Sequence, residues 1–281
     1  MITLVPIEHP SRGRRGVVLR RGAHLGEASP LAGRSRETYE DVLEALARGE
    51  VTLPSVEFAS WTLGARIERT SLASQALLES AASAISVLRG RVAPAALKLK
   101  LRARQDADVL AEIRALAPRA RLRVDANRAF AREGDVPWDA LVRSGVEWIE
   151  EPCPDAGSLV GTPVPIALDE SVEEDAARAL EAVADGRAAA LVLKPMLLGA
   201  RETLRIGRAC KDLGGRVVVS HTFESEIGRR GAEQLARRLD PAEIHGLERW
   251  DGIDGYRLAL GLTPLESLLD PGDRHADPAL G

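Results

Sequence analysis

Residues 96–101 read ALKLKL, and residues 190–195 read ALVLKP. Both runs have the apolar composition of a buried strand, yet they contain three lysines, Lys98, Lys100 and Lys194. Only four of the 38 lysine and arginine residues are lysine, the fourth being Lys211. Because arginine supplies nearly all the other cations, lysine in these strands indicates a role that arginine cannot fill. A buried lysine can lose its proton, whereas arginine stays charged.

Short apolar runs of this kind recur along the chain, and the polar residues that end them are 19 to 26 residues apart. The segments between them have helical periodicity, so the pattern predicts parallel βα units. Eight such units close into a (β/α)8 barrel. A doubly wound open sheet is the alternative, but the sequence has neither GxGxxG nor a Walker loop. The predicted strands are AISVLRG (84–90) as the first, then 96–101, 121–127, 147–152, 165–171, 190–195, 216–222 and 243–248.

The first 80 residues do not follow this rhythm. They contain two apparent strands, a turn-rich loop (GEASPLAGRS, 26–35) and a helix that ends at a glycine, RETYEDVLEALARG (36–49). We therefore predict a small, shortened α+β capping domain at 1–80, an enolase-like barrel with the active site at 81–260, and a C-terminal segment at 261–281 that packs back on the cap.

The composition excludes several classes of function. With 281 residues, 45% apolar and 28% charged, the chain is an ordinary globular protein, and its net charge of −4 gives no field for nucleic acid or anionic membranes. Five arginines between residues 12 and 21 are interpreted as a solvated basic loop, because only 3% of residues are aromatic. The partner is therefore expected to be neither nucleic acid nor a membrane.

The two cysteines, Cys153 and Cys210, lack the spacing of a zinc site or of a disulfide framework, and we expect both to be small buried side chains. The N-terminus has no signal-peptide pattern, and no apolar run reaches membrane-spanning length. We therefore expect a cytoplasmic protein.

In a barrel, residues at the carboxyl ends of the strands point into the mouth of the active site. Three of them, Asp125, Glu150 and Asp169, are carboxylates on adjacent strands, flanked by Lys100 and Lys194. Carboxylate oxygens suit a hard divalent cation such as Mg²⁺, and two opposed lysines can exchange protons with a substrate. Each carboxylate alone is also consistent with a helix cap or an ion pair, as in LDES (168–171). The combination favours a metal site.

The motifs together carry a more specific resemblance. KLK (98–100), RVDANRAF (123–130), IEEPC (149–153), LDES and LVLKP (191–195) resemble the muconate-lactonizing subgroup of the enolase superfamily in order and spacing. Within this subgroup, GEASPLAGRSRETYE (26–40), PSVEFA (54–59) and SHTFESEIG (220–228) are most similar to the o-succinylbenzoate synthase group. The resemblance covers nearly the whole chain.

The resemblance implies a role for each matching residue. Asp125, Glu150 and Asp169 match the ligands of Mg²⁺, for which Mn²⁺ can substitute, and Asn127 lies beside them. A lysine base with Mg²⁺ stabilising an enediolate is the established arrangement of enolase-superfamily sites. Lys100 matches the base, and Lys194 matches the opposing lysine that stabilises the anion. The expected substrate is a small carboxylate, with these candidates for holding it: Lys98, Arg123, Ser220, His221 and Thr222.

The implied activity is an Mg²⁺-dependent hydro-lyase that forms o-succinylbenzoate by syn elimination of water, in menaquinone biosynthesis. An N-acylamino acid racemase, a dipeptide epimerase or a cycloisomerase with the same two lysines is the first alternative. Two more remote alternatives are a Schiff-base aldolase at Lys194 and a non-catalytic barrel. The aldolase gives no role to the three strand-end carboxylates, and the non-catalytic barrel gives none to either the carboxylates or the lysines. The oligomeric state, monomer or homo-oligomer, is not predicted.

Two departures from the resemblance concern substrate binding. Only SRGRR (11–15) separates the first two predicted strands, where relatives often carry a longer mobile lid. The seventh barrel strand ends in SHTFES (220–225), where close relatives tend to have a run of serines.

Overall fold

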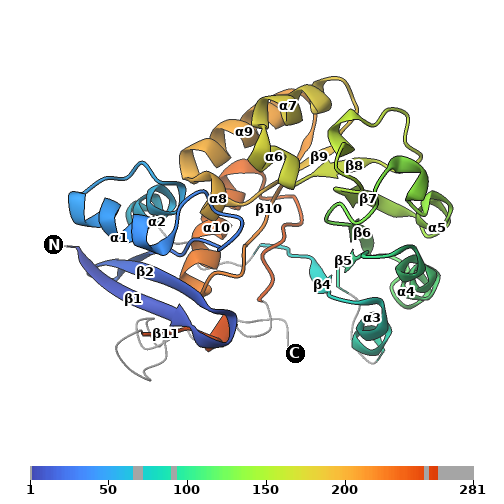
Figure 1. The fold of residues 1–281 in the computed structure, drawn as a ribbon. Helices are drawn as coiled ribbons and strands as arrows, with labels where there is room; N and C mark the ends of the chain where they lie inside the picture. The colour runs from blue at the N-terminus through green and yellow to red at the C-terminus, as the bar shows by residue number, and fades with distance from the viewer. Residues whose placement is uncertain (1, 66–71, 90–93, 250–252, 259–281) are drawn as a thin grey trace.

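The computed structural model describes residues 2–65, 72–89, 94–249 and 253–258 (Figure 1). This part of the chain forms two sheets. The first is antiparallel, with the strand order β11-β1-β2-β3, and the second is parallel, with the order β10-β9-β8-β7-β6-β5-β4. In Figure 1 the parallel sheet is curved, with its helices on the outer side, and the antiparallel sheet lies beside it.

The N-terminal part combines the antiparallel sheet with two helices. Val17 and Leu19 on one face of β2 pack against these helices, while Val18 on the other face packs with Ile227 and Tyr256. The sheet is therefore buried between its own helices and helix α10 of the barrel. Its elements are β1 (Thr3–His9), β2 (Arg14–Arg21), β3 (His24–Ala28), β11 (Arg257–Leu258), α1 (Tyr39–Arg48) and α2 (Pro54–Gly64).

The sequence predicted part of this domain. The two N-terminal strands and the helix that ends at a glycine are confirmed; Thr38 and Asp41 form a capping box at the start of α1, and Gly49 ends it with φ 70°. The segment 26–35, predicted as a loop, begins inside β3, and α2 was not predicted.

The parallel sheet places polar residues on its inner face. Leu97, Leu99 and Val124 point outward into the main core between strands and helices, so Lys98, Lys100 and Asp125 point inward. The strands are β4 (Ala76–Leu78), β5 (Ala96–Lys100), β6 (Arg121–Asp125), β7 (Val146–Glu150), β8 (Ile166–Leu168), β9 (Ala190–Leu193) and β10 (Arg216–Val219).

The helices between and after these strands cover the sheet. They are α3 (Ala81–Leu88), α4 (Leu110–Leu116), α5 (Trp138–Arg143), α6 (Glu170–Glu174), α7 (Ala176–Ala184), α8 (Pro195–Leu198), α9 (Ala200–Asp212) and α10 (Glu226–Leu239). Short 3-10 turns occur at η1 (Pro10–Arg12), η2 (Arg104–Val109), η3 (Glu133–Asp135), η4 (Ala156–Ser158) and η5 (Ile253–Gly255).

The segment predicted as the last strand, 243–248, closes the ring through two isolated bridges. Ser220 pairs with Gly246, and Ser74 pairs with His245, both in parallel. The amide N–H of Gly246 donates to the carbonyl of Val219 at 2.9 Å, and that of Gln75 donates to the carbonyl of His245 at 2.9 Å. The edges at β10 and β4 are thereby joined, which confirms the barrel architecture.

One predicted strand is wrong. The run AISVLRG (84–90) was predicted as the first barrel strand, but Ala81–Leu88 is the helix α3, and the first strand is β4 at Ala76–Leu78. A short apolar run does not distinguish a buried strand from a buried helix. The domain boundaries at residues 80 and 260 stay predictions, and the segment 261–281 lies outside the described residues.

No helix within the described ranges is both long enough and apolar enough to cross a membrane.

Candidate active site

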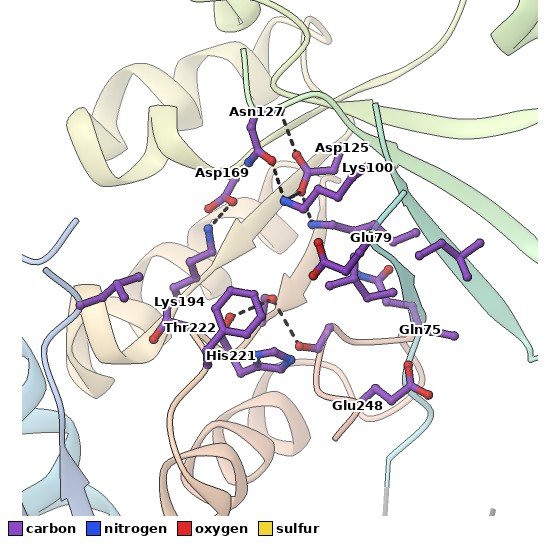
Figure 2. A pocket seen from close by; sticks show the side chains of 18 of the residues that line it. Gln75, Glu79, Lys100, Asp125, Asn127, Asp169, Lys194, His221, Thr222 and Glu248 are labelled. Carbon is purple, nitrogen blue, oxygen red and sulfur yellow. Dashed lines mark hydrogen bonds and ion pairs between the residues drawn. The ribbon is translucent and has the colours of Figure 1, made fainter. Parts of the chain in front are cut away.

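The carboxyl ends of the barrel strands surround a cavity of about 640 Å³ (Figure 2). Cavities of this size hold small molecules. Its lining includes eight residues expected or found at the ends of strands: Lys98, Lys100, Asp125, Asn127, Asp169, Lys194, Ser220 and His221. In Figure 2 Lys100 and Asp125 lie on one side of the cavity, and Lys194 and Asp169 lie on the other.

The three lysines are bonded to the three carboxylates. The Nζ of Lys98 lies 2.8 and 2.9 Å from the two carboxylate oxygens of Glu150 and 2.8 Å from Oδ2 of Asp125. Lys100 donates to the same Oδ2 of Asp125 at 2.8 Å, and Lys194 donates to Oδ2 of Asp169. The two candidate catalytic lysines are therefore anchored to carboxylates on different strands.

Burial and mutual charge set the ionisation of this group. Asp125, Glu150 and Asp169 are each only 1% exposed. Burial, followed by the charge of Asp125, raises the pKa of Glu150 to about 8. Burial would also raise the pKa of Asp125 and Asp169, but the adjacent lysines lower both below their usual range.

For the lysines, burial and the neighbouring charges also shift the pKa in opposite directions. Burial by itself would lower the pKa of Lys98 and Lys194, but the carboxylates beside them raise both pKa values above the usual range. Lys98 and Lys194 are therefore cations in this structure.

Asp125, Glu150 and Asp169 are the candidate ligands of a metal ion. Among the described residues, no three acidic, histidine or cysteine side chains form a group that could hold one, and the ammonium of Lys98 lies 2.8 Å from both Asp125 and Glu150. Two observations nevertheless fit a cation. Oδ1 of Asp169 is buried without a hydrogen-bond partner in the described structure, and the charges of Asp125 and Asp169 raise the pKa of Glu150. Three mutually repelling buried carboxylates fit a hard divalent cation once the lysine ammonium groups withdraw.

Asn127 connects the two sides of the site. It follows β6 in a left-handed conformation with φ 43°, which asparagine tolerates better than most residues. Its Oδ1 accepts from Lys100 at 2.5 Å, and its Nδ2 donates to Glu170 at 3.1 Å. It thus orients the Lys100 ammonium group.

The backbone of Asp169 is held by the carboxylate of Glu151, which was not predicted as a site residue. Glu151 is fully buried, and its Oε1 accepts from the backbone amides of Asp169 at 2.9 Å and Ser171 at 2.8 Å. Arg128 donates to its Oε2 at 3.0 Å. Glu151 therefore caps α6 and positions the main chain of the predicted metal ligand.

Arg123 does not lie where the sequence predicted. It is fully buried, and its guanidinium donates to Glu147 at 2.7 Å, Gln75 at 2.8 Å and Glu243 at 2.8 Å. It is not among the residues that line the cavity. The prediction that Arg123 grips a substrate carboxylate is therefore not supported by its position; its partners make it part of the floor of the barrel.

Ser220, His221 and Thr222 all line the cavity. Burial, reinforced by the positive charge of Arg229, lowers the pKa of His221 to about 3, so this imidazole is neutral. Thr222 is held by two buried partners: its Oγ1 lies 2.8 Å from Oε2 of Glu224, and Arg14 donates to its carbonyl and, at 3.3 Å, to its Oγ1.

Sequence reasoning did not predict Arg34 as a residue of the site. Arg34, in the loop after β3, lines the cavity and lies 3.0 Å from Glu170, 2.7 Å from Glu173 and 3.9 Å from Asp169. It brings the N-terminal domain into contact with the barrel mouth. Nothing in a loop sequence indicates such a long-range contact.

The family model described as "Enolase C-terminal domain-like" matches residues 79–256. The o-succinylbenzoate synthase of Citrobacter koseri is 30% identical over 261 residues, which cover 79% of this chain and 78% of the relative. That of Escherichia coli K12 is 29% identical over 265 residues, covering 84% and 82%.

Solved structures share the fold. The o-succinylbenzoate synthase from Thermosynechococcus elongatus BP-1, complexed with Mg in its active site, has a TM-score of 0.63 at 24% identity, covering 95% of this chain and 96% of that one. The dipeptide epimerase from Methylococcus capsulatus, complexed with Mg ion, has a TM-score of 0.69 at 20% identity, covering 94% and 96%. The fold, the matched family model and the curated relatives agree, and the chain belongs to the enolase superfamily.

Proposed function

We propose that this protein is an Mg²⁺-dependent hydro-lyase that forms o-succinylbenzoate by syn elimination of water through an enediolate. The observation that carries the proposal is that Lys100 and Lys194 line one cavity from opposite sides, each bonded to a different buried carboxylate. The curated relatives at about 30% identity over about four fifths of the chain support this reaction over others. The product would place the enzyme in menaquinone biosynthesis, in the cytoplasm.

Asp125, Glu150 and Asp169 would hold the metal. Bound there, Mg²⁺ would supply positive charge to the carboxylate oxygens of a substrate and lower the energy of the enediolate. The chain itself positions one of these ligands, because Glu151 accepts hydrogen bonds from the backbone amides of Asp169 and Ser171.

Lys100 would act twice. Its amine first takes the proton α to the substrate carboxylate, and the electron pair of that C–H bond moves into the enediolate. The enediolate then expels the β-hydroxyl group, and the ammonium of Lys100 returns the proton to it, so that water leaves. One base on one face of the substrate gives a syn elimination, and Asn127 keeps its ammonium group near the cavity.

Lys194 would stabilise the anion from the other side. As a cation it would pair with negative charge on the enediolate without transferring a proton. The N-terminal domain reaches the mouth of the barrel through Arg34, which pairs with Glu170 and Glu173.

A racemase or epimerase of N-acylamino acids or dipeptides is the second candidate. Two lysines on opposite sides of one cavity can remove a proton from one face and return it to the other. This function would require both Lys100 and Lys194 to transfer a proton, and the curated relatives favour the hydro-lyase over it.

The test is conversion of the cyclohexadiene precursor of o-succinylbenzoate, followed by ultraviolet absorbance, with Mg²⁺ and with EDTA. We expect metal-dependent aromatisation in the wild type. A general acid–base group contributes about 10²- to 10⁴-fold to the rate, so Lys100→Ala should lower kcat by about 10²-fold or more. Lys211→Ala is the matched control, since Lys211 pairs with Asp240 at 2.7 Å on the outside of the barrel.

A folded wild type that leaves the precursor unchanged would contradict the proposed reaction. Racemisation of N-succinylamino acids by the same preparation would then support the second candidate. Equal activity of Lys100→Ala and Lys211→Ala would remove the catalytic role from Lys100.

A further inference from the structure

Gln75 is a buried polar residue at the bottom of the cavity. It directly precedes β4, it is only 6% exposed, and it lines the same cavity as Lys98 and Lys194. Its backbone amide donates to the carbonyl of His245 at 2.9 Å, which fixes the main chain at this point. In Figure 2 Gln75 lies across the cavity from Lys194. It therefore belongs to a part of the wall that the proposed proton transfers do not use.

Arg123 determines how the side-chain amide of Gln75 is oriented. The Nη1 of Arg123 donates to Oε1 of Gln75 at 2.8 Å. Because a guanidinium only donates, the amide oxygen must face Arg123, and the Nε2 group is turned away from it. Two carboxylates, Glu147 and Glu243, offset the charge of Arg123 behind the amide. A hydrogen bond accepted by an amide oxygen also makes the N–H groups of that amide stronger donors.

The Nε2 group of Gln75 is open to the cavity. Within the part of the chain that the structure describes, this group has no hydrogen-bond partner, and it is not among the polar atoms that are sealed from solvent without one. Gly246 leaves the opening, because a Cβ at that position would lie 3.2 Å from Nε2 of Gln75 and 2.7 Å from Oγ of Ser220. Buried polar groups are nearly always paired, so these two N–H donors indicate a partner in a bound ligand.

The surroundings of this amide favour a neutral partner. Glu79 and Glu248 line the same cavity, and in Figure 2 they lie on either side of Gln75. A carboxylate bound there would exchange its water for neutral donors beside two acidic side chains, which is costly for a charged group. A carbonyl oxygen loses much less on leaving water and pairs well with an amide N–H.

We propose that Gln75 donates a hydrogen bond to a neutral carbonyl oxygen of the substrate, and that this contact selects substrates with a carbonyl group in the side chain that does not react. The inference rests on the proposed function for the identity of that oxygen. Besides its two carboxylates, o-succinylbenzoate has one neutral carbonyl, the ketone of the succinyl chain. Gln75 is then the residue that recognises this ketone.

The test compares two ligands and four proteins by calorimetry in the presence of Mg²⁺. The ligands are o-succinylbenzoate and the analogue in which a methylene group replaces the ketone. The proteins are the wild type, Gln75→Met, Gln75→Glu and Gln105→Met. Gln75→Glu keeps an oxygen for Arg123 and nearly the same shape, but an ionised carboxylate has no N–H donor. Gln105 is the matched control, because it is exposed and is not among the residues that line the cavity.

We expect the wild type to bind the ketone about 5- to 100-fold more tightly than the methylene analogue, which is the range for leaving a buried donor unpaired. In Gln75→Met and Gln75→Glu the two ligands should bind about equally, whereas Gln105→Met should keep the wild-type preference. The preference is a ratio measured within one protein, so a general loss of affinity in a variant cancels.

A wild type that binds both ligands equally, or neither of them, would overturn the assignment. A preference for the ketone that persists in both Gln75 variants would do the same. A wild type that makes no o-succinylbenzoate, yet prefers the ketone in a Gln75-dependent manner, would refute the proposed function and keep Gln75 as the recognition residue.

Discussion

Lys98 shows how a single residue can hold the site together before any ligand binds. It is 8% exposed, and its ammonium group contacts both Glu150 and Asp125. A buried lysine is costly unless it is paired, and the same is true of the two carboxylates. The scarcity of lysine in this chain made Lys98 conspicuous in the sequence, but only the structure shows that it bonds two of the predicted metal ligands.

Lys98→Met should therefore destabilise the metal-free protein. Removing one partner of a buried ion pair leaves uncompensated charges, at a cost of about 3 kcal/mol in the free energy of unfolding. Saturating Mg²⁺ should recover much of this loss, because the cation then neutralises Asp125 and Glu150. Urea denaturation with EDTA and with Mg²⁺ measures both values. Lys211→Met is the control, and a Lys98→Met protein as stable as this control would argue against the buried pairing.

At the scale of the strands, the inward-pointing residues form two levels. The upper level holds the site, and the lower level is a layer of charges around Trp148. The guanidinium carbons of Arg123 and Arg216 lie 4.0 and 4.4 Å from the ring centroid of Trp148. Glu243 joins both arginines, at 2.8 Å from each. This layer seals the floor of the barrel where 243–248 completes the ring.

The contribution of Glu243, in the floor of the barrel, to the free energy of unfolding should be lost in acid. Burial alone would raise the pKa of Glu243, but hydrogen bonds from Arg216 and from the Ile244 amide, with the charge of Arg123, lower it from 4.5 to about 2. The unfolded state therefore binds more protons between these values, so the contribution of Glu243 is complete above about pH 4.5 and is lost as the pH falls through about 2.

Glu243→Gln should lower the free energy of unfolding by about 2 kcal/mol near pH 7, and by much less near pH 3. Urea denaturation at the two pH values measures this difference. Glu44→Gln, which removes an exposed carboxylate paired with Arg48, should show no such loss. If the deficit of Glu243→Gln were the same at both pH values, the loss would not come from its ionisation.

The two levels show which features of the barrel strands could be predicted from the sequence. The alternation of the strands places Lys98, Lys100, Arg123 and Asp125 on the inward face, because the period of two is fixed by the pleat. Alternation does not predict whether a long side chain bends toward the mouth or the floor of the barrel. Lys98 bonds Glu150 at the mouth, whereas Arg123 bonds Glu243 in the floor. The first strand was missed for a related reason, since β4 has only three residues and α3 offers a longer apolar run.

At the scale of the whole molecule, hydrogen bonds to two glutamate side chains join the N-terminal domain to the barrel. Glu27 of β3 is fully buried and accepts from the backbone amides of Ser225 at 3.1 Å and Gly228 at 3.0 Å, so it caps α10. Glu57 of α2 accepts in the same way from Ala200 and Arg201 at the start of α9. These contacts join residues more than 140 positions apart, and no local sequence pattern indicates them. The N-terminal domain is therefore attached to the helices that surround the site.

Binding of Mg²⁺ should stabilise this whole assembly through the three carboxylates. A ligand that binds only the folded state adds RT ln(1 + [L]/Kd), or about 2.7 kcal/mol at 100 times Kd. We expect this increment in the unfolding free energy of the wild type and its loss in Asp125→Asn/Asp169→Asn. Asp240→Asn, which removes a carboxylate outside the cavity, should keep it. Since only the difference with and without Mg²⁺ is compared, any change in the starting stability of a variant cancels. An equal increment in all three proteins would place the cation elsewhere and would remove Asp125 and Asp169 from the proposed metal site.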